Sequence, residues 1–322
     1  MITLIVKKPL LIKIIYIYIV SMNIISYSIG IVPPPNDFDK EKYDNYLSKI
    51  INRIDRSDIN SVLIYDIQEN DWHKDMSRPF KYQKTCDPRV LTSDLKKRYS
   101  RDIKYFTYVA LNQDNSSTCE VFENFIKDAV NIYSVENIVL VNTTNGNHIL
   151  LEDACRILKN FRINFGGVVI PERHRNKKDE HKRIYERSKM GMSFFTSQII
   201  YNADNIITFL KDYNELLKQN NDTPCKIILS FAPFGRAETC KFLEWLGVEI
   251  SLGTSNRILS RKSTDECIDE SIEICTGLLS LIKFTYQKNQ LTIPIGINIE
   301  SVSKFNNEQD AVDKLLLMLK EN

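Results

Sequence analysis

The sequence predicts a single (β/α)8 barrel, an α/β fold in which eight parallel strands alternate with helices. Short apolar runs, many of them rich in β-branched residues, alternate with amphipathic segments along most of the chain, as expected for strands buried on both faces. The loop after the first run reads Val-Pro-Pro-Pro-Asn-Asp and lacks the glycine-rich phosphate loop with which an open doubly wound sheet usually begins. Eight repeats without that loop favour the closed barrel.

Each element follows from its own pattern of apolar residues. The predicted strands are 24–32, 61–67, 103–110, 137–142, 165–170, 193–200, 226–232 and 293–299. Apolar residues at helical spacing predict the helices between them. These lie near 43–54, 90–100, 118–133, 149–161, 178–190, 206–217, 236–246, 268–282 and 306–320. In such a barrel the functional residues are expected where the strands end, at the carboxyl face.

Composition excludes several classes of function. The 322 residues are 43% hydrophobic, enough for a sizeable core, and the net charge of +2 gives no case for binding nucleic acid. Seven scattered cysteines form no CxxC pair, so neither a zinc site nor a disulfide framework is predicted. A reducing compartment is the simplest setting, and we expect a cytoplasmic protein.

The first 21 residues form a separate hydrophobic extension. Lys7 and Lys8 precede an apolar run that resembles a signal peptide or a short anchor, but Lys13 interrupts it and the rest is shorter than the ~20 residues of a membrane span. We expect sequence ahead of a genuine start at Met22, no membrane attachment, and one barrel domain over residues 22–322.

The densest group of polar residues is the segment 171–187, Pro-Glu-Arg-His-Arg-Asn-Lys-Lys-Asp-Glu-His-Lys-Arg-Ile-Tyr-Glu-Arg. Its cations could hold a diphosphate or another polyanion, because charge-assisted hydrogen bonds to oxyanions are strong. The alternative is a solvated helix face. His174 and His181 are seven residues apart without an HExxH pattern, so no metal site is expected.

Three consecutive motifs carry a family resemblance. Gly-Gly-Val-Val-Ile-Pro-Glu-Arg-His-Arg is followed by a basic helix, then by Ser-Phe-Phe-Thr-Ser-Gln-Ile-Ile-Tyr-Asn and Ile-Leu-Ser-Phe-Ala-Pro-Phe-Gly-Arg. In this order and spacing the chain resembles the catalytic barrel of methylenetetrahydrofolate reductase, most specifically over 164–250. The resemblance implies reduction of 5,10-methylenetetrahydrofolate to 5-methyltetrahydrofolate, with FAD and NAD(P)H, in one-carbon and methionine metabolism. It does not decide whether the chain forms a homo-oligomer.

The resemblance also assigns residues. Gln198 and Thr144 match positions that hold the folate, and an amide such as that of Gln198 suits a planar heterocycle because it offers both a donor and an acceptor. The positions that match flavin contacts are His174, Glu180, Arg183, Arg187 and Asn142.

Two departures from the family concern its acidic residues. Gly30 stands where the family has the glutamate that protonates the folate, and Asn142 to Thr144 replace an Arg-Gly-Asp motif. General acid catalysis contributes roughly 10²–10⁴-fold, so another acid is needed. The candidates are Asp66, Glu69 and Glu172. Restoring the carboxylate with Gly30→Glu is expected to raise turnover.

Two further hypotheses stay open. One is a flavin oxidoreductase of the same fold with another substrate. The other is a catalytically silent barrel that binds flavin or folate.

Overall fold

The computed structural model describes residues 24–321 except 70–71, 74–75 and 143–146. The predicted extension at residues 1–21 therefore lies outside the described part of the chain. Among the described helices, none combines the length and the apolar character needed to cross a membrane.

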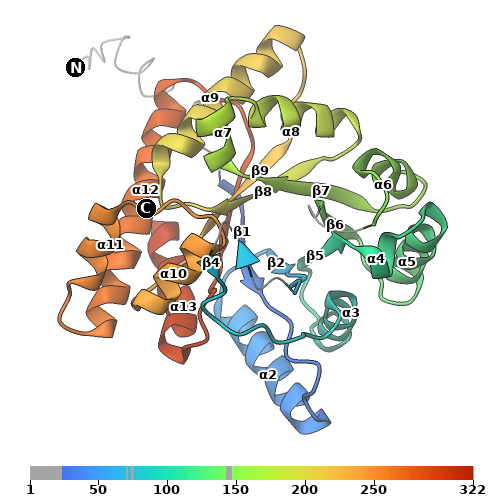
Figure 1. Cartoon of the computed structure of the whole chain (residues 1–322), viewed down its shortest axis with the longest axis horizontal. Coiled ribbons are helices and arrows are strands. Elements are labelled where there is room, and N and C mark those ends of the chain that lie inside the picture. Colours follow the sequence, from blue (N-terminus) through green and yellow to red (C-terminus); the bar gives the residue numbers. More distant parts are fainter. Residues whose placement is uncertain (1–23, 70–71, 74–75, 143–146, 322) are drawn as a thin grey trace, which may run out of the picture.

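The eight predicted strands form a closed parallel barrel (Figure 1), which confirms the predicted fold. They are β1 (Ile24–Ile31), β2 (Ser61–Ile64), β5 (Lys104–Leu111), β6 (Asn137–Asn142), β7 (Asn164–Val169), β8 (Phe194–Ile199), β9 (Lys226–Phe231) and β10 (Ile295–Ile299). Each strand pairs with the next along the chain, and β1 pairs with β10 to close the ring. All the carboxyl ends therefore meet at one mouth.

Helices surround the barrel (Figure 1). They are α2 (Lys40–Arg56), α3 (Pro88–Arg98), α4 (Gln113–Ser116), α5 (Cys119–Asn131), α6 (Leu151–Leu158), α7 (Pro171–Lys177), α8 (Glu180–Lys189), α9 (Ala203–Asn220), α10 (Ala237–Trp245), α11 (Leu252–Leu259), α12 (Thr264–Lys288) and α13 (Asn306–Glu321). The α9 helix shows why they form. Asn202 caps its first turn by accepting a hydrogen bond from the Asp204 backbone, and the predicted stripe containing Ile206 and Leu210 is buried.

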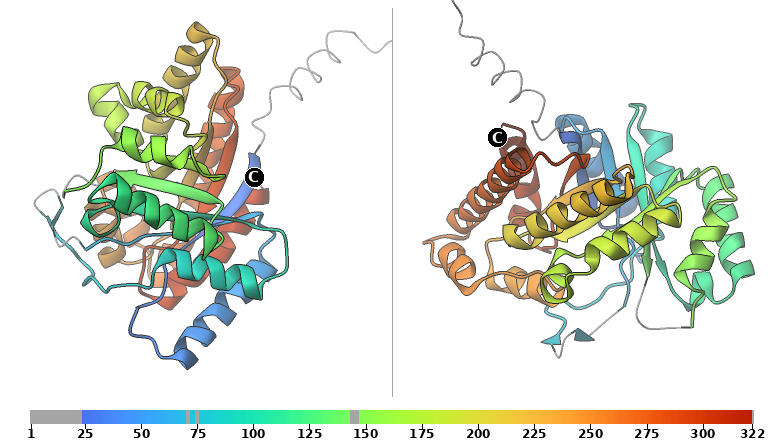
Figure 2. Two further views of the ribbon diagram at one scale, coloured as in Figure 1. Left: turned by 90° about the vertical axis from the view of Figure 1, so that its right-hand side faces the viewer. Right: turned by 90° about the horizontal axis from the view of Figure 1, so that it is seen from above.

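Some elements were not predicted. α8 lies within the predicted helix 178–190, but α7 was not predicted. Pro171 starts α7, and Lys178, with a left-handed φ of 51°, ends it. The short α4 and α11 were missed. So was a two-stranded ribbon of β3 (Trp72–His73) and β4 (Met76–Ser77), which stands out from the barrel in Figure 2.

The inside of the barrel changes character along the strands. A layer of buried apolar side chains fills its middle: Leu63, Phe106, Val139, Phe194 and Ile228. Successive residues of a strand alternate between faces, so the residues two positions further on face inward as well. Four of those residues are polar, namely Tyr65, Tyr108, Thr196 and Ser230. The interior thus becomes polar toward the mouth.

Candidate active site at the carboxyl mouth of the barrel

Hydrogen bonds connect the polar layer across the barrel. The Tyr108 hydroxyl lies 2.8 Å from the Thr196 hydroxyl. On the other side, Asn298 of β10 donates from Nδ2 to the Tyr65 hydroxyl at 3.0 Å and to the Ser230 hydroxyl at 3.1 Å. The two tyrosine rings meet edge to face, with centroids 4.7 Å apart. Five strands or their ends therefore contribute to one connected group.

Glu300, directly after β10, adds a carboxyl group to this layer. It is only 9% exposed, and its Oε1 lies 3.4 Å from Asn298 Nδ2. Burial raises the pKa of Glu300 to about 7, against the opposing effect of hydrogen bonds from Tyr65 and Ser230. Burial also raises the pKa of the Tyr65 and Tyr108 hydroxyls, so both remain neutral phenols at neutral pH. The mouth therefore holds a carboxyl that is about half protonated near neutrality.

Asn298 has an unused acceptor. Its side chain is fully buried, and its Oδ1 accepts no hydrogen bond from any residue in the described part of the chain. An unsatisfied buried oxygen costs about 1–3 kcal/mol. A ligand N–H or a water molecule in the polar layer would recover this energy.

Gly30 lies beside Glu300 and has no room for a side chain. A Cβ at this position would lie 2.6 Å from Cε2 and 2.7 Å from the hydroxyl of Tyr65, and 2.8 Å from Cβ of Glu300. A side chain at this position would therefore have to displace Tyr65 or Glu300, and the expectation that Gly30→Glu raises turnover stays a prediction. The space that a side chain on β1 would take is already occupied by neighbouring side chains.

The predicted acids lie in different surroundings. Asp66 follows β2 and is half-buried, and its carboxylate accepts hydrogen bonds from the Ala110 backbone at 2.8 Å and from Gln68 at 2.7 Å. Burial raises its pKa, while those two bonds act in the opposite direction. Glu69 is exposed, and Glu172 is half-buried in the first turn of α7. Their roles as acids stay predictions.

Gln198 is half-buried near the carboxyl end of β8. Its Nε2 donates to the carbonyl oxygen of Leu246 at 2.6 Å, which ties the strand to the end of α10. This bond is one structural reason for a glutamine at this position of the strand. Thr144, the other predicted folate contact, lies outside the described residues.

Predicted flavin contacts line a cavity of about 420 Å³ between the end of β6 and α8. Asn142, Arg183 and Arg187 all belong to its wall, and Arg187 donates to the Val168 carbonyl oxygen at 3.2 Å. Burial lowers the pKa of Arg187. The three cations of the wall (Lys182, Arg183 and Arg187) are matched by three acids (Glu152, Asp179 and Glu186). Because these charges cancel, the wall gives a flavin diphosphate weaker electrostatic support than the segment 171–187 suggested.

A second cavity, of about 620 Å³, lies at the opposite end of the barrel. Its wall contains the first residues of three strands, Lys104, Asn137 and Asn164. Barrel enzymes place their chemistry at the carboxyl face, so the smaller cavity beside the mouth is the better candidate for a cofactor or substrate.

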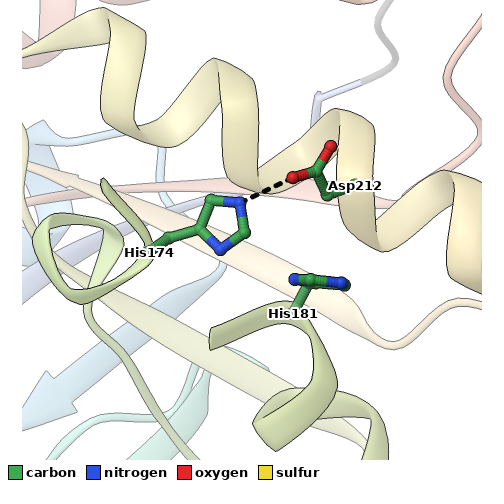
Figure 3. Close-up of side chains that lie close together, drawn as sticks. All are labelled: His174, His181 and Asp212. Carbon is green, nitrogen blue, oxygen red and sulfur yellow. Dashed lines mark hydrogen bonds and ion pairs between the residues drawn. The ribbon is translucent and has the colours of Figure 1, made fainter. Parts of the chain in front are cut away.

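Glu180 and His174 are buried away from that cavity wall. Glu180 accepts a hydrogen bond from the Ile170 backbone at 3.0 Å, and Arg183 lies 3.4 Å from its other oxygen. His174 Nε2 lies 2.9 Å from Asp212 of α9, and the His181 ring meets His174 edge-on (Figure 3). These contacts join α7, α8 and α9, and direct flavin contacts by Glu180 and His174 stay predictions.

His174, His181 and Asp212 are residues of the types that bind a divalent metal. One possible ligand atom from each of His174, His181 and Asp212 lies within 4.8 Å of the others. A metal-bound histidine normally donates its other ring N–H to an acceptor. Among the described residues, His174 Nδ1 has no hydrogen-bond partner, so a metal on Nε2 would leave a buried N–H unsatisfied. In this structure His174 Nε2 is paired with Asp212, and the expectation of no metal site stays a prediction.

Comparison with known proteins gives one strong likeness. An uncharacterized protein from Clostridium thermocellum, described as binding two copies of 5-methyl-5,6,7,8-tetrahydrofolic acid, is 27% identical with a TM-score of 0.77. The match covers 97% of this chain and 99% of that chain. A GH113 β-1,4-mannanase matches at 9% identity and a TM-score of 0.51, covering 91% of this chain and 98% of its own, and shows the fold alone. No family model matches the chain, and no curated protein matches its sequence.

Sequence reasoning missed Tyr65, Asn298 and Glu300 as site residues. A signal was available in Ile-Asn-Ile-Glu at 297–300, where two polar residues alternate with isoleucines at strand spacing. That pattern places Asn298 and Glu300 on the same face. It does not reveal that this face looks into the barrel.

Proposed function

We propose that the chain binds a reduced folate at the mouth of the barrel and reduces 5,10-methylenetetrahydrofolate to 5-methyltetrahydrofolate with NAD(P)H. One observation carries this proposal: the likeness to the Clostridium thermocellum protein over nearly the whole of both chains, together with what that protein binds. The motif resemblance supports the same ligand class.

The chemistry of the polar layer suits a pterin. A pterin ring presents N–H groups and a carbonyl along its edges, so it needs acceptors and donors fixed in a partly dry pocket. Asn298 Oδ1 supplies an acceptor, and the Tyr65 hydroxyl supplies a donor or acceptor. Gln198 adds an amide at the same end of the barrel.

FAD belongs to the proposal as the cofactor that the resemblance implies. Asn142, Arg183 and Arg187 would hold it, since all three line the cavity beside the mouth. When bound, a flavin accepts a hydride from the nicotinamide and passes it on. Because the charges of the wall balance, flavin binding needs a direct test. The absorbance spectrum of the purified protein shows whether flavin is bound.

A catalytically silent folate-binding barrel is the second candidate, and Gly30 favours it because the family glutamate is missing there. Two measurements separate the candidates. Calorimetric titration of the purified chain with 5-methyltetrahydrofolate tests binding, and absence of binding would overturn both candidates. Oxidation of NAD(P)H in the presence of 5,10-methylenetetrahydrofolate, with and without added FAD, then tests for the reductase.

A further inference from the structure

The carboxyl group of Glu300 lies beside the position where the family glutamate is missing. β1 and β10 are adjacent in the barrel, and Ile29 pairs with Ile299, so Gly30 and Glu300 follow side by side. A Cβ on Gly30 would lie only 2.8 Å from the Glu300 Cβ. Gly30, which lacks a side chain, and the carboxyl group of Glu300 are therefore direct neighbours at the mouth of the barrel.

We propose that Glu300 is the general acid of the folate reaction, supplied by β10 in place of the residue that β1 lacks. This assignment rests on the proposed function. Nothing in the motif resemblance points to Glu300, and the inference comes from the packing of Gly30, Tyr65 and Glu300 at the mouth.

The step that Glu300 performs is a proton transfer. In 5,10-methylenetetrahydrofolate the methylene carbon bridges N5 and N10. The Glu300 carboxyl gives its proton to N10, and the bond between N10 and the methylene carbon breaks with its electron pair going to N10. The resulting N5 iminium accepts a hydride that originates from NAD(P)H, which is oxidised to NAD(P)+, and gives the N5-methyl product. The Glu300 carboxylate then regains a proton from solvent.

The surroundings of Glu300 suit this step better than those of Asp66. The Asp66 oxygens accept well-formed hydrogen bonds from the Ala110 backbone and Gln68, which stabilise the anion. Glu300 also accepts hydrogen bonds, from Tyr65, from Ser230 and, at 3.4 Å, from Asn298, but it is more deeply buried than Asp66 and burial outweighs these bonds. Because burial raises its pKa to about 7, about half of Glu300 carries the proton near neutral pH, where a general acid is most effective.

Among the described residues, the groups that interact with Glu300 add no charge that would oppose the transfer. The titratable side chains facing Glu300 are Tyr65 and Tyr108, and burial raises the pKa of both well beyond neutral pH. Asn298 and Ser230 are neutral. Asn298 lies within reach of both Glu300 and Tyr65, so it positions the acid relative to the polar layer.

The test compares the wild type, Glu300→Gln, Glu300→Asp and Asp66→Asn. Each protein is titrated with 5-methyltetrahydrofolate and assayed for NAD(P)H-dependent reduction of 5,10-methylenetetrahydrofolate over a range of pH, with FAD added. We expect Glu300→Gln to lower kcat by about 10²–10⁴-fold while the folate Kd changes by less than about fivefold. Glu300→Asp should retain part of the rate. The wild-type fall in kcat above about pH 7 should disappear in Glu300→Gln.

Each other outcome has a definite meaning. A wild type that binds no folate overturns the proposed function. A wild type that binds folate without turning it over, or a Glu300→Gln variant with unchanged kcat, overturns the assignment of Glu300 alone. A variant that loses folate binding and turnover in proportion also overturns it, because Glu300 would then bind the pterin rather than protonate it. A large loss in Asp66→Asn with none in Glu300→Gln would transfer the role to Asp66.

Discussion

Replacing Glu300 by glutamine should stabilise the protein at alkaline pH and leave its stability nearly unchanged in mild acid. The amide keeps the shape of the carboxyl but carries no charge at any pH. In the folded chain, burial raises the Glu300 pKa to about 7 from an ordinary value of 4.5. The folded state therefore binds more protons than the unfolded state between those two values.

The sign and size follow from proton linkage. Where the folded state binds more protons, the free energy of unfolding falls as pH rises, so the wild type is most stable below about pH 4.5 and loses stability up to about pH 7. The pKa difference of about 2.5, at about 1.4 kcal/mol per pKa unit, amounts to about 3 kcal/mol. The Glu300→Gln variant has no carboxyl to ionise at this position. Its free energy of unfolding should therefore rise relative to that of the wild type by about 3 kcal/mol between pH 4.5 and about pH 8.

Urea denaturation of both proteins, followed by circular dichroism at several pH values, measures this difference. Asp222→Asn is a suitable control, because the partly exposed Asp222 carboxylate is paired with Lys189 and its pKa is lowered, so its effect should have the opposite sign. A pH-independent difference between wild type and Glu300→Gln would refute the reasoning. It would mean that Glu300 is ionised in the folded state without a penalty.

The remaining predictions concern one residue each. Gly30→Ala should destabilise the chain by about 1–3 kcal/mol in urea, because its Cβ collides with Tyr65 and Glu300; an alanine at Gly277, which has open space around it, is the control. Gln198→Ala should weaken folate or nicotinamide binding by about 5–30-fold in calorimetry while flavin content stays the same, whereas the exposed Gln219→Ala should bind normally. Arg187→Glu should lower the flavin absorbance of the purified protein, and the exposed Arg156→Glu should not; equal flavin content in all three proteins would remove Arg187 from the flavin site.

Local sequence patterns were sufficient to predict the barrel. All eight strands form within about three residues of their predicted limits, because each is an apolar run that must be buried on both faces. The long helices lie where they were predicted, as the buried stripe of α9 shows, although α12 extends beyond the predicted 268–282 at both ends. α8 lies within the predicted helix 178–190, whereas α7 was missed because its highly charged segment carries little apolar periodicity.

The candidate site was predictable only in outline. The sequence placed polar residues at the strand ends and put Gly30 at the position where the family that the chain resembles has a glutamate. Only the tertiary structure decided which acid comes close to that position. Gly30 and Glu300 are 270 residues apart in the sequence and become neighbours solely because β1 and β10 close the barrel. The tertiary structure also decided the character of that acid, because the pKa of a carboxyl depends on burial and on the partners that the fold places around it, here Tyr65, Ser230 and Asn298.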